Sequence, residues 1–96
     1  MKQLTASNFK DEIKKGKTLV DFNADWCGPC QMQAPILEAM SKDYHIASLN
    51  IDDAPEIAEE YGVSSIPCLI IFKDGKEVRR KIGLTPESAI KKLMEQ

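Results

Sequence analysis

Two cysteines separated by two residues are the part of this sequence best able to do chemistry. Cys27 and Cys30 belong to the run Trp26-Cys27-Gly28-Pro29-Cys30, which follows an apolar run, Thr18 to Phe22, and precedes a stretch with helical periodicity. The thiols are therefore predicted where a strand ends and a helix begins, with Cys27 at the exposed tip. A thiolate is the reactive form of cysteine, and the free amides and dipole of a helix start favour negative charge. One thiol can attack a foreign disulfide, and the other can resolve the mixed disulfide that results.

An aspartate in the preceding strand is the second candidate for chemistry. Asp21 lies between Val20 and Phe22, where aspartate is poorly suited to a strand. Two interpretations stay open. The carboxylate is partly exposed or satisfied by local amides, or it is a buried acid near Cys30. Burial would raise its pKa and let it accept the Cys30 proton as that thiol attacks the mixed disulfide.

Zinc binding is an alternative use of the same cysteine spacing. The possible ligands are Cys27, Cys30, Cys68 and His45. A domain with its own core does not need a metal to fold, so we expect no metal. Three cysteines is an odd count, which argues against a disulfide scaffold and fits one pair with one thiol left over. His45 is expected to be structural or solvent-facing.

Composition limits the size and class of the protein. The chain has 96 residues, 43% of them hydrophobic, which predicts one domain over residues 1–96 with one modest core. A net charge of −2 fits neither a nucleic-acid-binding surface nor an acidic disordered tail. No apolar run approaches the roughly 20 residues that span a bilayer, so no membrane contact is expected. The start has no apolar signal region, and we expect a cytoplasmic protein with reduced thiols.

The elements that position these residues follow from periodicity and turn signals. The core-facing positions of the helix after the cysteines are predicted to be Met32, Ile36, Leu37, Met40 and Tyr44, with a kink at Pro35. Strands are predicted over Lys2–Leu4, Thr18–Asn23, His45–Ile51, Cys68–Phe72 and Glu77–Ile82. Helices are predicted from a cap at Thr5 or Ser7 to Gly16, from the cysteine motif to about Tyr44, from Pro55 to Gly62, and from Thr85-Pro86 onward.

The order β-α-β-α-β-α-β-β-α predicts an α/β fold. Strands separated by helices are expected to pair in parallel through right-handed crossovers. Asp74-Gly75 predicts a hairpin between the last two strands, which makes them antiparallel. The expected result is a mixed five-stranded sheet flanked by four helices.

The cysteine motif and the strand before it make the chain resemble the thioredoxin family, in particular its small bacterial members. The similarity runs over nearly the whole length: Val20-Asp21-Phe22, Trp26 to Cys30, Pro35, Asn50-Ile51-Asp52, Ile66-Pro67, Phe72 to Gly75 and Gly83. The resemblance implies the thioredoxin fold and a monomeric protein-disulfide reductase without a bound cofactor. Its electrons would come from NADPH through a thioredoxin reductase and pass to disulfide-containing client proteins. Cys27 would attack, Cys30 would resolve, and Asp21 would assist proton transfer.

The resemblance also implies a docking surface. Pro67 would be a cis-proline facing the disulfide, leaving the Ile66 backbone free to bond an extended substrate segment. Trp26, Gly28, Pro29, Ile66 and Gly83 would form a flat apolar surface around it. From the residues alone, Pro67 could be an ordinary loop proline and Trp26 a half-buried core residue.

Three residues depart from the family pattern. Cys68 stands where threonine is common, and it is either an inert buried thiol or a third redox thiol. Ser48 stands where many members have a lysine near the acid, so Asp21 lacks a partner that favours its charged form. Asn23 replaces a common aromatic residue and leaves Trp26 as the only tryptophan. A non-catalytic interaction subunit that uses the same surface is the alternative function.

Overall fold

The elements of the fold follow one another in the predicted order. The computed structural model describes residues 1–96. The elements are β1 (Lys2–Gln3), α1 (Phe9–Ile13), β2 (Lys17–Asn23), α2 (Gly28–Met40), β3 (Ile46–Asn50), α3 (Pro55–Glu60), β4 (Cys68–Lys73), β5 (Lys76–Ile82) and α4 (Glu87–Glu95). No helix is both long and apolar enough to cross a membrane. The α/β fold with a five-stranded mixed sheet and four helices is confirmed.

The strands form one sheet in the order β1-β3-β2-β4-β5, with β2 at its centre. β2 and β1 pair in parallel with β3, and β4 and β5 form the predicted antiparallel hairpin. The expectation that β4 also runs parallel is wrong, because β4 pairs antiparallel with β2. The only helix between β3 and β4 has six residues, about 9 Å of rise, which is too short to carry the chain back along the sheet. β4 therefore begins at the edge where β2 and β3 end.

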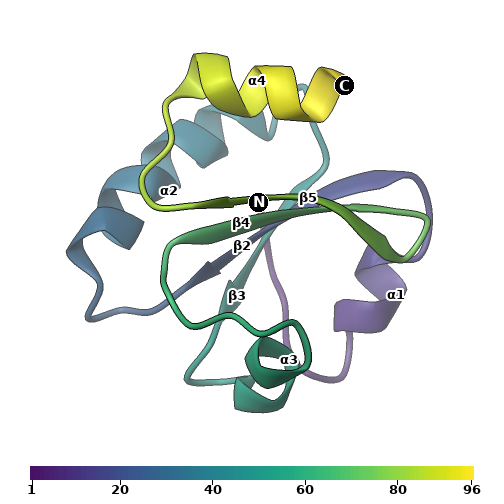
Figure 1. Ribbon diagram of the computed structural model, residues 1–96, viewed down its shortest axis with the longest axis vertical. Helices are drawn as coiled ribbons and strands as arrows, with labels where there is room; N and C mark the ends of the chain where they lie inside the picture. The colour runs from purple at the N-terminus through teal and green to yellow at the C-terminus, as the bar shows by residue number, and fades with distance from the viewer.

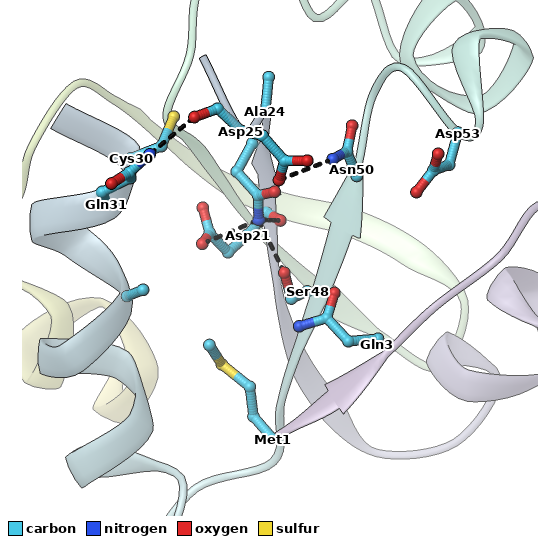
Figure 2. Close-up of a pocket in the computed structure, with 12 residues that line it drawn as sticks. Met1, Gln3, Asp21, Ala24, Asp25, Cys30, Gln31, Ser48, Asn50 and Asp53 are labelled. Carbon is cyan, nitrogen blue, oxygen red and sulfur yellow. Dashed lines mark hydrogen bonds between the residues drawn. The ribbon is translucent and has the colours of Figure 1, made fainter. Parts of the chain in front are cut away.

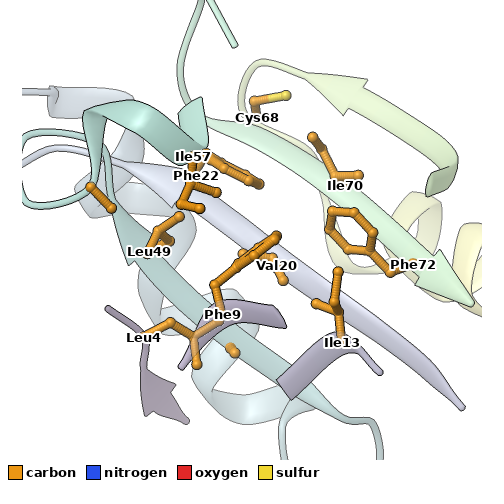
Figure 3. Close-up of a cluster of buried hydrophobic side chains, with 12 residues drawn as sticks. Leu4, Phe9, Ile13, Val20, Phe22, Leu49, Ile57, Cys68, Ile70 and Phe72 are labelled. Atoms are coloured by element: carbon orange, nitrogen blue, oxygen red, sulfur yellow. The ribbon is translucent and has the colours of Figure 1, made fainter. Parts of the chain in front are cut away.

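Helices cover both faces of this sheet, with α1 and α3 on one side and α2 and α4 on the other (Figure 1). Successive residues of a strand point to opposite faces, so β2 contributes to two cores. The core under α1 and α3 includes Phe9, Val20, Phe22, Ile70 and Phe72 (Figure 3). The core under α2 and α4 includes Leu19, Leu37, Met40, Leu69, Ile71 and Ile90. Burial on both faces explains the nearly continuous apolar sequence of β2.

Helix α2 differs from its prediction at its end. It ends at Met40 rather than about Tyr44. The Ser41 hydroxyl donates to the Glu38 carbonyl at 2.6 Å, so the side chain competes for a helix-end acceptor. The chain continues in turns from there to Tyr44. The helix continues through Pro35 without a break.

The inner face of α2 also differs. Leu37 and Met40 are buried and Ile36 packs beside them, as predicted, but Met32 is 62% exposed. The neighbouring Gln33 is fully buried instead. Its side-chain amide accepts from Thr85 N at 2.7 Å and donates to Thr85 O at 3.0 Å. A polar side chain thus takes an inner position because both of its hydrogen-bonding groups find backbone partners.

The turn predictions are largely confirmed. Asp74 and Gly75 both have positive φ, which is the conformation of a tight hairpin turn. Gly16 and Gly62 have positive φ after the helices that they were predicted to end. The prediction that Thr85 caps the last helix is wrong. The Thr85 hydroxyl donates to the Gly83 carbonyl instead, and Pro86 occupies the N-cap position of α4.

Candidate functional site

The two cysteines lie at the start of α2 and are joined by a disulfide, with 5.2 Å between their Cα atoms. Cys27 is the N-cap residue, and its sulfur accepts the Cys30 amide at 3.2 Å. Pro29 lies in the first turn, where its missing N–H costs nothing. A free helix-start amide directed at Cys27 stabilises a thiolate on that sulfur.

The exposure of Cys27 differs from the prediction. Only 5% of its surface is exposed, so the expected exposed tip is wrong. Ala24, Cys27 and Cys30 form a small buried cluster against which Ile66 packs. The loop before β4 covers the sulfur, and this contact is non-local in sequence.

Asp21 lies beneath the disulfide, in the middle of β2. Its exposed fraction is 1%, so the interpretation as an exposed strand end is wrong. Burial raises the pKa of this carboxyl to about 6, and the hydrogen bond from Asn23 opposes the shift. One carboxylate oxygen, Oδ1, makes no hydrogen bond. A buried carboxyl with a pKa near neutrality can both give and take a proton.

A cleft of about 440 Å³ connects Asp21 with Cys30. Figure 2 shows Asp21 on its strand facing α2, with Cys30 at the start of that helix and Ser48 beside Asp21 on the next strand. Asp21 and Ser48 are register partners in β2 and β3. Position 48 brings a hydroxyl rather than a cation to this site.

Asn23 belongs to the site through a contact with Asp21 that the sequence analysis does not predict. Its Nδ2 donates to Asp21 Oδ2 at 3.2 Å, to Asp21 O at 3.0 Å and to Ser48 Oγ at 2.7 Å. The spacing of the two residues could have predicted this contact, because residues two apart in a strand point to the same face of the sheet. The amide at position 23 therefore does more than leave Trp26 as the only tryptophan, because it bonds the carboxyl of Asp21.

Ile66 lies against Cys27, and the proline that follows it is cis. The Ile66–Pro67 peptide bond is cis, and the Ile66 carbonyl oxygen is 3.8 Å from Cys27 Sγ. The Ile66 N–H has no partner within the chain. Unpaired backbone groups beside the disulfide can bond an extended peptide.

The remaining residues of the expected docking surface lie around this point. Trp26 is 70% exposed, so the half-buried interpretation is wrong, and its indole N–H donates to Asp52 at 2.9 Å. Gly28 and Pro29 are exposed at the start of α2. Gly83 has φ +93°, which side chains rarely adopt, and its N–H bonds the Pro67 carbonyl at 2.8 Å. Because β4 runs antiparallel to β2 and β5 antiparallel to β4, Pro67 and Gly83 lie at the edge of the sheet where β2 ends, the edge from which the chain continues to Cys27.

The other titratable candidates lie apart from this chemistry. Cys68 is a free, buried thiol in the core under α1 and α3, and burial raises its pKa, which favours the inert interpretation. His45 precedes β3 and bonds Thr18 and Glu12. Cys27 and Cys30 are bonded to each other, and no cluster of three or more potential ligands is assembled for a metal ion.

Comparisons with known proteins agree with this geometry. The family described as Thioredoxin matches residues 1–96. "Thioredoxin" from Chlamydia caviae is 48% identical over all of this chain and 97% of its own length, and "Thioredoxin" from Chlamydia muridarum is 50% identical over 95% and 92%. The solved structure of a mutant thioredoxin from Halobacterium salinarum NRC-1 superposes with a TM-score of 0.93 at 35% identity, covering 98% of this chain and 87% of that one.

Proposed function

The chain belongs to the thioredoxin family and is a protein-disulfide reductase with the redox-active pair Cys27–Cys30, and on this basis we propose a role for each residue of its site. The observation that carries these roles is the asymmetry of the pair. Only the Cys27 sulfur accepts a helix-start amide, whereas only Cys30 shares the cleft with the buried Asp21.

Cys27 is the attacking thiol. In the reduced protein its thiolate attacks one sulfur of a client disulfide, a Cys27–client bond forms, and the second client sulfur leaves as a thiolate. The Cys30 amide, which donates to the Cys27 sulfur, holds the thiolate before the attack. The Cys30 amide is neutral, so it stabilises the Cys27 thiolate without placing a fixed positive charge beside it.

Cys30 completes the exchange with the help of Asp21. The Cys30 proton passes to the Asp21 carboxylate, and the Cys30 thiolate attacks Cys27 Sγ. The Cys27–Cys30 disulfide forms and the client leaves as a thiolate, so that two electrons have moved to the client. A base of raised pKa suits this step because it takes the proton as the thiolate forms and returns it afterwards.

The client is held beside Cys27 by backbone and apolar contacts. The unpaired N–H and the carbonyl of Ile66 would bond an extended client segment, as an added strand does. Trp26, Gly28, Pro29 and Gly83 would supply the apolar surface around it, with Pro67 ending the strand pairing beside it. Backbone bonding does not depend on the client's side chains, so the surface suits many clients.

The electrons are proposed to come from NADPH through a thioredoxin reductase that docks on the same surface. The protein itself binds no cofactor in this scheme. The cytoplasm is the compartment that the proposal expects, because a reductase must be kept in its dithiol form. The alternative of a non-catalytic interaction subunit has no support in the site, since the redox pair and its acid are all in place.

Trapping experiments test the roles of the two cysteines. Reduced Cys30→Ser protein mixed with oxidised insulin should accumulate a mixed disulfide through Cys27, because the resolving thiol is gone. Cys27→Ser should trap far less, and Cys68→Ser should turn over like the parent chain. Peptide mapping identifies the linked cysteine. An adduct that forms mainly through Cys30 would reverse the assignment.

The acid role has its own test. Asp21→Asn should slow the release of client from the mixed disulfide about tenfold or more, since a positioned base typically contributes at least that. Formation of the mixed disulfide should change less. Single-turnover kinetics followed by Trp26 fluorescence separates the two steps. An unchanged release rate would remove Asp21 from the mechanism.

A further inference from the structure

Asn23 is the only residue whose side chain hydrogen-bonds Asp21. We propose that Asn23, held by Ser48, is a positioning residue that fixes Asp21 Oδ2 and leaves Oδ1 as the oxygen that takes the Cys30 proton. The proposal rests on the role of Asp21 in the proposed function. It assigns a task to two positions at which this chain departs from its family's common residues.

The orientation of the Asn23 amide is determined by its three acceptors. They are Ser48 Oγ at 2.7 Å, Asp21 O at 3.0 Å and Asp21 Oδ2 at 3.2 Å. The two Asp21 oxygens favour an NH₂ group at this place, because a carbonyl oxygen there would face both of them without a proton between. Ser48 takes the shortest of the three bonds and lies in register with Asp21 on the neighbouring strand. It therefore anchors the amide beside the carboxylate.

The two oxygens of Asp21 become different as a result. Oδ2 accepts the amide proton, whereas Oδ1 is buried without a partner. Asp21 and Cys30 line the same cleft, where Figure 2 shows the carboxyl directed toward α2. A carboxylate with one oxygen already bonded accepts a new proton on the other. The Asn23 contact thus selects the oxygen that serves the reaction.

The same contact controls how strongly Asp21 holds its proton. Burial raises its pKa and Asn23 lowers it, so the amide is the one neighbour that favours the charged form. Among the other ionisable groups around it, the one cation is the Met1 ammonium, and it is paired with Glu38. Met1, whose ammonium bonds Glu38, and the carboxylates of Asp25 and Asp53 line the same cleft, Cys30 faces it from α2, and Cys68 lies on β4.

Substitution of Asn23 tests the proposal on the Asp21 carboxyl itself. Asn23→Leu keeps the side-chain size but removes the donor, so the pKa of Asp21 should rise by about one pH unit. The pH below which client release slows should rise with it, because Asp21 must be unprotonated to act as the base. Carboxyl ¹³C NMR measures the first quantity, and single-turnover kinetics against pH measures the second. Gln31→Leu is the matched control, since Gln31 lines the cleft but bonds the Asp25 carbonyl instead, and it should shift neither.

Ser48→Ala separates positioning from a general structural effect. It should shift the Asp21 pKa in the same direction by a smaller amount, and this shift should vanish in the Asn23→Leu background, since Ser48 acts through Asn23. An unchanged pKa in Asn23→Leu, or an equal Ser48→Ala shift in both backgrounds, would overturn the proposal. If Asn23→Leu does not fold, an unchanged pKa in Ser48→Ala alone would do so. A shifted pKa with an unchanged pH profile would uphold the effect of Asn23 on the carboxyl and instead refute the role of Asp21 in catalysis.

Discussion

The two faces of the central sheet differ in the kinds of side chain that they bury. The face under α1 and α3 is packed by aromatic and aliphatic side chains, among them Phe9, Phe22 and Phe72, and Thr18 is its one buried polar residue. The face under α2 and α4 holds the other buried polar side chains: Asp21, Gln33, Ser48 and Thr85. β2 belongs to both faces, so one strand carries core residues on one side and an ionisable acid on the other.

This contrast shows where stability and reactivity are located. The aromatic face gains free energy from packing, and its one buried ionisable group is the Cys68 thiol, whose pKa burial raises, so that it stays neutral. The opposite face contains a carboxyl that burial disfavours in its charged form, next to a cleft and the disulfide. A protein can carry such a group only if other contacts supply the stability that it costs. Removing a core ring on the first face and removing the charge of Asp21 on the second should therefore change stability in opposite directions.

The largest expected effect is on the aromatic face. Phe9→Ala removes a ring that contacts Phe22, Tyr61 and Phe72, with centroids 5.6 to 6.2 Å away. It should lower the free energy of unfolding by about 3–5 kcal/mol, as deletion of a buried phenylalanine does. Urea unfolding measures this change. The folded fraction should still reduce insulin at the parental rate, and a loss of specific activity would mean that the two faces are not independent.

The next effect has the opposite sign. Asp21→Asn should stabilise the oxidised protein at pH 8 by up to about 3 kcal/mol, because a pKa raised by roughly two units corresponds to that free energy. The folded-state pKa lies above the unfolded value, from 3.8 to about 6. The stability that protonated Asp21 contributes is therefore complete below about pH 4 and is lost as the pH rises through about 6. Urea unfolding from pH 4 to 8 should show the variant and parent converging at pH 4, and a constant gap would mean that ionisation of Asp21 is not the cause.

A smaller loss is expected at Gln33. Gln33→Leu leaves the Thr85 N–H and C=O without partners, which should cost roughly 1–3 kcal/mol. Hydrogen exchange at the Thr85 amide should become much faster, because that amide bonds only the Gln33 side chain. The neighbouring Met32→Leu, at an exposed position, is the matched control and should change neither. Retained protection at Thr85 would show that another group bonds this amide.

Much of the fold was predictable because its signals are local. The apolar run of β2, the Asp74-Gly75 turn, and Pro55 with Gly62 around α3 depend on residues close in sequence, and the structure confirms each. At the start of α2 local reasoning was insufficient. Periodicity favoured Met32 over Gln33, but Gln33 is buried because Thr85, 52 residues away, bonds both ends of its amide.

The amino-acid sequence by itself determined the order of the elements, the cysteine pair at a helix start and the acid in the strand before it, since each depends on short-range periodicity and turn chemistry. The tertiary structure alone decided that β4 runs antiparallel to β2, that Ile66 covers Cys27, and that Asn23 and Ser48 hold one oxygen of Asp21. These contacts join segments distant along the chain. Their energies depend on burial and on partners from other strands, which no local pattern specifies.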